Sequence, residues 1–302
     1  QNAKGDAIKV KGVTNIKFLR VKTEWTNGPN PENGAYGLYP VESTNVLIDG
    51  CVAIGASDAG IYVGQSKNII VRNSRAEFNV AGIEIENSYY ADVFDNVATN
   101  NTGGILVFDL PGLPQQGGHH VRVFNNRSVG NNTDNFAPEG NIVGEVPRGT
   151  GIIIQANSNV EIFNNEIGDN DTVNIAVVTY GNETDDDAYY PHPKSIQIHG
   201  NKFGPTGYNP DTSKGELAEI LFELSKGNMP DIFWDGLVPI SQMFFGQPED
   251  EKMIIANNGD ATFLAIKPIG FMVPFLNPAT LDINEFYGEI SPLAKVEFDE
   301  NF

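Results

Sequence analysis

The sequence lacks the features of disulfide-rich, membrane-spanning and nucleic-acid-binding proteins. It has a single cysteine, Cys51, so stability must come from packing and hydrogen bonds rather than an internal disulfide. No run approaches the roughly 18 to 20 apolar residues of a membrane span. Basic residues are scarce, with 19 Lys and Arg against 39 Asp and Glu. The resulting net charge of −20 disfavours nucleic acid as a partner, because phosphates would be repelled.

Several common catalytic and metal-binding motifs are also missing. No Gly-x-Ser-x-Gly, phosphate-binding loop or dinucleotide fingerprint occurs, and the four histidines lack the spacing of a zinc site. We assign no metal ligand, but Ca²⁺ stays open as a cofactor because the acidic runs 169–171 and 185–187 carry oxygen ligands. The chain begins Gln1-Asn2 without a start methionine, which indicates a mature or trimmed product.

What the sequence does contain is an internal repeat. A small residue followed by an aliphatic, a variable and an aliphatic residue recurs at 60–63, 82–85, 104–107 and 151–154. A second alternating pattern lies between these copies, at 45–48, 68–71, 90–93, 120–123, 159–162 and 195–198. Both patterns have the period of two that is typical of strands. Two short strands every 22 residues or so cannot bury their apolar face alone, so the units are expected to stack.

The repeat predicts an all-β fold, a right-handed parallel β-helix of about seven or more coils over residues 1–210. Residues 211–302 no longer follow it. Within them, Ser213 to Ser225 predicts one amphipathic helix with Leu217, Ile220, Leu221 and Leu224 on a single face. The remainder predicts a cap and a wrapping segment packed on the same solenoid, because an open end would expose unpaired strand edges.

Two stacks of side chains are expected along the solenoid. An Asn or Asp after each second strand predicts an inward amide ladder, formed by Asn73, Asp95, Asn125 and Asn164. The preceding aromatic residues predict a ring stack that packs against a covering segment, formed by Phe94, Phe124 and Phe163.

Four insertions interrupt the repeat, at 22–34, 109–119, 132–149 and 179–194, and all four flank the first strand pattern. Long loops that border one sheet would wall a groove whose floor is the outward face of that sheet. If the aliphatic residues point inward, the outward line runs through Lys9, Tyr39, Tyr62, Glu84, Leu106 and Ile153. Glu42, Gln65 and Glu86 are expected beside this line.

Tyrosines next to glutamates suit a sugar platform, since rings stack on pyranose faces while carboxylates accept hydroxyl hydrogens. Glu84 and Glu86 lie two residues apart on one strand face, roughly 7 Å by strand rise, which permits an acid–base pair. Exposed tyrosine and glutamate suit a solvated sheet or a protein contact equally well, so this alternative stays open.

Residues 36–48 and 60–63 resemble the coils of carbohydrate-active right-handed β-helices, notably mannuronan C5-epimerases. The segment Tyr36-Gly37-Leu38-Tyr39-Pro40-Val41-Glu42 is similar to their Tyr-Gly-x-Asp-Pro-His-Asp, whose Asp and His take part in catalysis. Tyr39, Val41 and Glu42 replace those three residues, and valine cannot exchange a proton. The resemblance therefore implies the fold and not the epimerase mechanism.

Residues 5 to about 270, including 57–66 and 82–88, are most similar to a bacterial family of parallel β-helix repeat-containing proteins without an assigned activity. Its members are exported, often as lipoproteins, and are often encoded beside another exported protein. The resemblance implies a periplasmic, extracellular or lipoprotein-anchored location, and another exported protein as a partner is one alternative.

Three functions remain open. The first is binding, with or without modification, of an extended polysaccharide or oligosaccharide in the groove. The second is a non-enzymatic envelope scaffold that docks a partner protein, which predicts a flat apolar patch and no carboxyl group of perturbed pKa. The third is a uronate lyase or epimerase with Tyr39 or Tyr62 as base and Arg148 neutralising the uronate; it requires a cation such as Lys9 to lower the tyrosine pKa.

The candidate catalytic residues are Tyr62, Glu84 and Glu86. The candidate ligand-binding residues are Lys9, Tyr36, Tyr39, Glu42, Asp58, Gln65, Asp109 and Arg148. An active site would bring the two glutamates, Tyr62 and a basic group together in one pocket with raised carboxyl pKa values.

Overall fold

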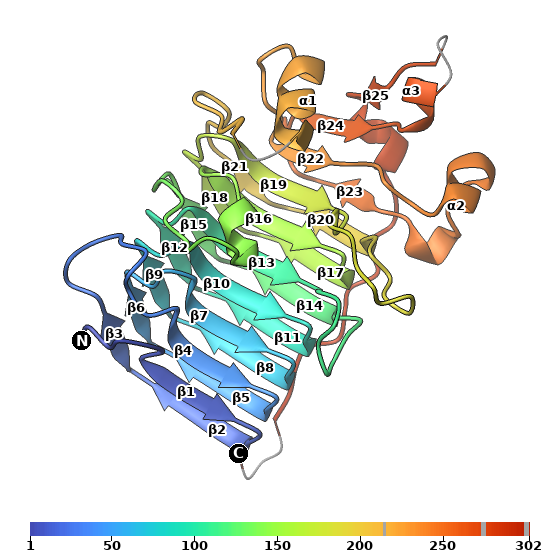
Figure 1. Cartoon of the computed structure of the whole chain (residues 1–302). Coiled ribbons are helices and arrows are strands. Elements are labelled where there is room, and N and C mark those ends of the chain that lie inside the picture. The colour runs from blue at the N-terminus through green and yellow to red at the C-terminus, as the bar shows by residue number, and fades with distance from the viewer. Residues whose placement is uncertain (214–215, 273–275, 299–301) are drawn as a thin grey trace.

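The chain winds into stacked coils of short strands, seen as parallel rows of arrows in Figure 1. The computed structural model describes residues 1–213, 216–272, 276–298 and 302. Three sheets run along the coil axis, and apart from β25 at one end every pairing is parallel. Successive strands of one sheet come from successive coils, so residues about 22 apart become neighbours.

Sheet A contains the first predicted strand pattern and continues well past residue 210. Its strands are β1 (Ile8–Lys11), β4 (Tyr36–Val41), β7 (Ala59–Gly64), β10 (Ala81–Glu86), β13 (Gly103–Phe108), β16 (Thr150–Gln155), β19 (Val173–Val178), β22 (Ile232–Trp234), β24 (Phe263–Ile266) and β25 (Ala279–Thr280).

Sheet B contains the second pattern. Its strands are β2 (Thr14–Leu19), β5 (Thr44–Asp49), β8 (Lys67–Arg72), β11 (Tyr89–Phe94), β14 (His119–Phe124), β17 (Ser158–Phe163), β20 (Lys194–His199) and β23 (Ile254–Ala256).

Sheet C was not predicted. Its strands have two or three residues: β3 (Lys22–Glu24), β6 (Val52–Ile54), β9 (Arg75–Glu77), β12 (Val97–Thr99), β15 (Arg127–Val129), β18 (Glu166–Gly168) and β21 (Lys202–Phe203). The middle residue points inward and is often small, as with Ala53, Ala76 and Ala98. One inward residue per strand cannot produce a recognisable alternation, which is why the sequence pattern gave no signal here.

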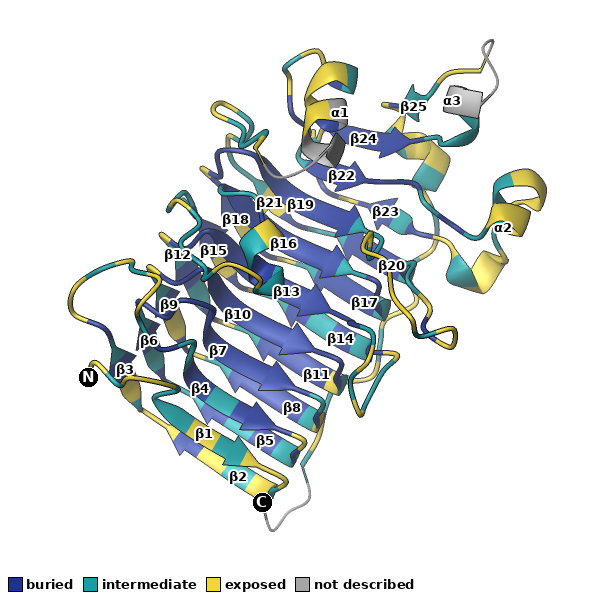
Figure 2. Ribbon diagram, in the orientation of Figure 1, coloured by how far each residue is buried: buried dark blue, intermediate teal, exposed yellow. Residues whose placement is uncertain are grey.

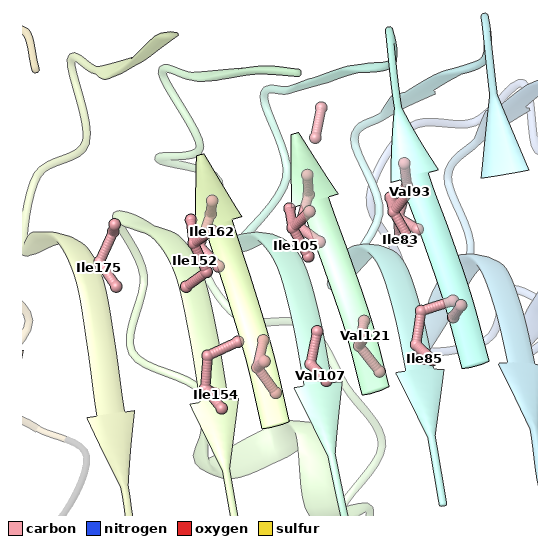
Figure 3. Close-up of a cluster of buried hydrophobic side chains, with 14 of the residues drawn as sticks. Ile83, Ile85, Val93, Ile105, Val107, Val121, Ile152, Ile154, Ile162 and Ile175 are labelled. Atoms are coloured by element: carbon pink, nitrogen blue, oxygen red, sulfur yellow. The ribbon is translucent and has the colours of Figure 1, made fainter. Parts of the chain in front are cut away.

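The core fills the inside of the coil with β-branched residues. Ile83, Ile85, Ile105 and Val107 of sheet A face residues such as Val121 of sheet B, as Figure 3 shows, and all five are fully buried. Each such side chain contributes about 1.5–3 kcal/mol by leaving water. In Figure 2 the middle strands of sheet A are buried along almost their whole length, whereas the first coil is largely exposed.

The amide ladder exists, but it is one residue further along than predicted. Asn73, Asp95, Asn125 and Asn164 are exposed and have φ between 50° and 54°. They turn the chain through a left-handed corner, which Asn and Asp tolerate better than other side-chain-bearing residues. The inward ladder consists of Asn96, Asn126, Asn165, Asn201 and Asn258. Each of the first four amide nitrogens donates to the next amide oxygen at 3.0–3.1 Å.

The predicted ring stack is confirmed by the geometry. The rings of Phe94 and Phe124, and of Phe124 and Phe163, lie 4.8 Å apart and nearly parallel. Residues 288–298, here called the C-terminal strap, run back along the coils toward the N-terminal end (Figure 1). The strap makes its hydrogen bonds to the adjacent column of sheet B rather than to the rings, because that column offers Asp92, Arg122, Glu161 and Gln197 as partners.

Helices are confined to loops and to the C-terminal third. They are η1 (Ile142–Glu145), α1 (Glu216–Leu224), α2 (Ile240–Phe245), η2 (Glu249–Glu251), α3 (Ile269–Met272) and η3 (Ile283–Phe286). The helix expected over 213–225 corresponds to α1, in which Leu221 is buried; the side chains of Leu217 and Ile220 fall outside the described residues. None of the helices described here is long and apolar enough to cross a membrane.

Candidate functional site

The outward face of sheet A changes character along the solenoid. Its central column runs from Lys9, Tyr39 and Tyr62 through Glu84 to the apolar Leu106, Ile153, Ala176 and Phe233. The neighbouring column places Gly64, Glu86, Phe108 and Gln155 in register. The predicted outward line is therefore formed, with polar chemistry on the N-terminal coils and apolar side chains beyond β10.

Three tyrosines cluster at the N-terminal end of this face. The ring centroid of Tyr36 lies 4.2 Å from that of Tyr39, and both lie 4.8 Å from that of Tyr62. The Lys9 ammonium is 4.3 Å from the centre of the Tyr39 ring. Tyr36 and Tyr39 are half-buried, whereas Tyr62 is buried, so only the first two present ring surface to a ligand.

Three carboxyl groups lie directly behind the tyrosines, and we call Asp58, Glu84 and Glu86 the carboxyl trio. The Tyr36 hydroxyl donates to Asp58 Oδ2 at 3.1 Å, and the Tyr62 hydroxyl donates to Glu86 Oε1 at 2.6 Å. Glu84 Oε2 is buried without a hydrogen-bond partner among the described residues. The exposed fractions of Asp58, Glu84 and Glu86 are only 7 %, 1 % and 7 %.

Glycine at position 64 makes the hydrogen bond from the Tyr62 hydroxyl to Glu86 possible. A Cβ atom on Gly64 would lie 2.1 Å from the Tyr62 hydroxyl oxygen. Because Gly64 stands beside Glu86 in the register, the phenol reaches across the empty space above it to the carboxyl group.

Burial raises the pKa of every member of the trio. The pKa values of Asp58 and Glu86 rise to about 7, although the hydrogen bonds from Tyr36 and Tyr62 act in the opposite direction. The pKa of Glu84 lies well above its usual value through burial and the nearby charges of Glu86 and Asp58. At neutral pH the trio therefore holds protons that exposed carboxyl groups would have released.

The trio is covered by the insertion 132–149, here called the covering loop, drawn in green over sheet A in Figure 1. Asn141 donates from Nδ2 to Asp58 Oδ2 at 3.1 Å. Val143 and Val146 pack in the same buried outer-face cluster as Tyr62. The sequence predicted the wall of a groove here, whereas this loop packs over the outward face of sheet A itself.

Glu42 and Gln65 lie away from the trio. Both have positive φ, 51° and 52°, and turn the corner that follows β4 and β7. The carboxylate of Glu42 pairs with Lys11 Nζ at 2.8 Å. Their expected place beside the outward line, which Glu86 does occupy, is wrong, because β4 and β7 end one residue before them and Gly64 rather than Gln65 is in register with Glu86.

Asp109 and Arg148 have other partners. Asp109 accepts hydrogen bonds from the backbone N–H groups of Gly117 and Gly118 at 3.1 and 2.7 Å, and burial raises its pKa to about 6. Arg148 lies 3.5 Å from Asp171, so its charge is already paired. Asp109 thus braces the turn at 109–118, while Arg148 ties the end of the covering loop to the next coil.

No cation reaches the trio within the described part of the chain: none of its carboxyl groups takes part in an ion pair there. Lys9 lies above Tyr39, 3.6 Å from Asp6. Burial raises the pKa of Tyr62, with Glu86 contributing, and raises that of Tyr39 to about 12. A tyrosine base, which the third hypothesis requires, is disfavoured by both shifts because deprotonation becomes harder.

The described residues contain no group of three or more His, Cys, Asp or Glu side chains arranged to hold a metal ion. Asn141 is the site residue that the sequence did not indicate, since the covering loop has no repeat register. The pairs Tyr36–Asp58 and Tyr62–Glu86 could have been found, because they are 22 and 24 residues apart, close to one coil.

A family model described as a right-handed β-helix region matches residues 1–112. The fold is a right-handed parallel β-helix. Among solved structures, this β-helix is similar to the A-module of mannuronan C-5 epimerase AlgE4 from Azotobacter vinelandii, with a TM-score of 0.52 and 13 % identity over 81 % of this chain and 59 % of that one. It is also similar to a double mutant of the periplasmic alginate epimerase AlgG, with a TM-score of 0.44 and 17 % identity over 64 % and 44 %.

This β-helix spans less than two thirds of the length of both epimerase structures. No curated protein sequence matches it. The identities are low, so the likeness concerns the fold, which agrees with the replacement of the epimerase Asp and His by Tyr39 and Val41.

Proposed function

We propose that this β-helix binds a neutral polysaccharide across Tyr36 and Tyr39 and hydrolyses it with Glu84 and Glu86 as an acid–base pair. The observation that carries the proposal is the convergence of three protonatable carboxyl groups and two tyrosine hydroxyls on one sheet face. The epimerase structures that share the fold act, by their names, on mannuronan and alginate, which supports a polysaccharide as the ligand class.

The two glutamates differ in environment, as acid–base catalysis of glycoside cleavage requires. Glu84 is the more deeply buried and keeps its proton, so it suits the acid that protonates the departing sugar oxygen. The pKa of Glu86 lies near 7, so its ionised form suits the base that takes a proton from the attacking water. Water then supplies the hydroxyl to one fragment and the proton that restores the pair. Substrate reaches both groups only when the covering loop moves away from Asp58.

A neutral glycan fits this face better than a uronate. A uronate carboxylate would meet the negative charge of Asp58 or Glu86 with no cation within reach of the trio in the described residues. Neutral hydroxyls can instead donate to these carboxyl groups while a pyranose ring stacks on Tyr39. Export to the periplasm or cell surface and a Ca²⁺ requirement stay predictions.

A thermal-shift and calorimetry screen tests the binding. Wild type, Tyr39→Ala and the control Tyr90→Ala, which removes an exposed tyrosine of sheet B, are titrated with neutral hexasaccharides and with uronate hexasaccharides, with and without Ca²⁺. We expect a neutral hexasaccharide to stabilise wild type and the control but not Tyr39→Ala. No shift of wild type with any glycan, or stabilisation only by uronates, would contradict the proposal.

Hydrolysis is tested separately by following new reducing ends. Glu84→Gln and Glu86→Gln are expected to bind the hexasaccharide and to lose turnover. If wild type binds without releasing reducing ends, binding stands and the acid–base role is rejected.

A second function is favoured by a different observation, an apolar patch on α2. Phe245, Ile240 and Phe244 have exposed fractions of 91 %, 74 % and 59 %. A patch of this kind suits docking of a partner protein, as the scaffold hypothesis requires. The same hypothesis expects no carboxyl group of perturbed pKa, so it does not account for the trio. Co-sedimentation of wild type and Phe245→Glu with candidate exported partners tests it. Equal binding of a partner by wild type and by the variant would reject the patch as the docking site.

A further inference from the structure

Sheet A carries a separate cavity of about 380 Å³ beyond the carboxyl trio. Its floor consists of outward residues from β13, β16, β19 and β22: Phe108, Ile153, Gln155, Ala176, Val178 and Phe233. Ile142 and Val146 of the covering loop form one wall, and Leu221 of α1 forms another. The volume lies within the range of about 300–1,000 Å³ that is typical of small-molecule sites.

The cavity exists because one side chain of the floor is small. In the central column, Ala176 stands between the much larger Ile153 and Phe233. The covering loop and α1 pack over the neighbouring positions, as the burial of Val146 and Leu221 in the same outer-face cluster shows. Space for several side-chain atoms is therefore left above Ala176.

The polar groups around the cavity favour a ligand that donates a hydrogen bond over an anionic ligand. The side-chain oxygen of Gln155 is buried and accepts no hydrogen bond within the described ranges. The hydroxyls of Thr150 and Thr172 already donate to the carbonyl oxygens of Pro147 and Arg148. No lysine, arginine or histidine is among the described residues that line the cavity, and Glu145 stands at its wall.

We propose that this cavity binds an uncharged, mainly apolar molecule or glycan substituent whose hydroxyl or amide N–H donates to Gln155 Oε1. The apolar body lies on Ala176 between Ile153 and Phe233. The site does not depend on the trio being catalytic, because Glu84 and Glu86 are not among its lining residues. A polar sugar ring does not suit it, since Gln155 Oε1 is the one buried oxygen of the floor without a partner among the described residues.

Calorimetry with 1-naphthol, an uncharged apolar ring system with one hydroxyl donor, tests the site. We expect saturable binding to wild type, loss of binding in Ala176→Phe, and unchanged binding in Ala294→Phe, which adds the same ring at an exposed position of the strap. A folded Ala176→Phe protein that binds 1-naphthol as tightly as wild type, or a wild type that does not bind it, would overturn the proposal.

A second variant tests the ligand chemistry without filling the cavity. Gln155→Leu is expected to weaken 1-naphthol about five- to tenfold, the effect of one hydrogen bond. Binding of 1-methoxynaphthalene, which lacks the donor, is expected to stay within twofold of wild type. Equal losses for both compounds would reject the role of Gln155.

A third probe separates the two sources of such a ligand. If 1-naphthyl β-D-glucoside binds at least as tightly as 1-naphthol, the cavity accepts a substituent carried on a sugar. If only 1-naphthol binds, the ligand is a free small molecule. The glucoside could also bind at Tyr39, so its binding is measured with Tyr39→Ala as well. Binding that Tyr39→Ala retains belongs to the cavity and not to the proposed polysaccharide site.

Discussion

Replacing Glu86 by glutamine should stabilise the protein, and only at high pH. The pKa of Glu86 rises to about 7 from its ordinary 4.5, chiefly through burial. The folded protein therefore binds this proton more tightly than the unfolded chain does. Stability linked to the group is fully present below pH 4.5 and is lost as the pH rises through 7.

The magnitude follows from the two pKa values. The interval between 4.5 and about 7, at about 1.4 kcal/mol for each pH unit, corresponds to roughly 3 kcal/mol. Glutamine keeps an oxygen that can accept the Tyr62 hydrogen bond and carries no charge. We expect Glu86→Gln to exceed wild type in free energy of unfolding by up to about 3 kcal/mol at pH 8.5 and to match it near pH 4.

Guanidinium titrations at pH 4, 6 and 8.5, followed by tryptophan fluorescence, measure this difference. Glu139→Gln serves as the control, because Glu139 is an exposed glutamate within the covering loop and its substitution should leave the curves unchanged. The reasoning is refuted by a difference between Glu86→Gln and wild type that is the same at all three pH values. A variant less stable than wild type at pH 8.5 refutes it as well.

Three further changes test the packing around the site and along the solenoid. Gly64→Ala should displace the Tyr62 hydroxyl and lower stability by about 1–3 kcal/mol, measured by thermal unfolding. Asn126→Ala removes a rung of the inward ladder and should cost about 3–5 kcal/mol by chemical denaturation, whereas Asn125→Gly at the left-handed corner should change stability by less than about 1 kcal/mol. Arg122→Met leaves Asp92 buried without its guanidinium partner and should cost about 3–5 kcal/mol, measured in the same way.

The fold could be predicted because its signal is repeated. The inward isoleucines at 61, 83, 105 and 152 recur with the strand period in each coil, so their outward neighbours were correctly placed on one face. The ladder was misplaced by one residue for a local reason. Asn125-Asn126 and Asn164-Asn165 offer two amides in a row, and only the backbone angles decide which one turns the corner and which points inward.

The burial of the carboxyl trio could not be predicted in the same way. It depends on the covering loop, whose Asn141, Val143 and Val146 occupy an insertion without any repeat register. The sequence pattern therefore placed Glu84 and Glu86 on an open sheet face. The structure places them under protein, where their pKa values rise.

The trio is not something that the solenoid needs. One coil further on, β13 places Leu106 and Phe108 at the positions that β10 gives to Glu84 and Glu86, and the strands pair without interruption. Apolar residues are therefore compatible with these positions, whereas the buried carboxyl groups cost stability at neutral pH and one oxygen lacks a partner among the described residues. A local cost that the neighbouring coil avoids is characteristic of residues that serve chemistry rather than folding, which is why we propose the acid–base role for β10 and not for the more exposed acids of the loops.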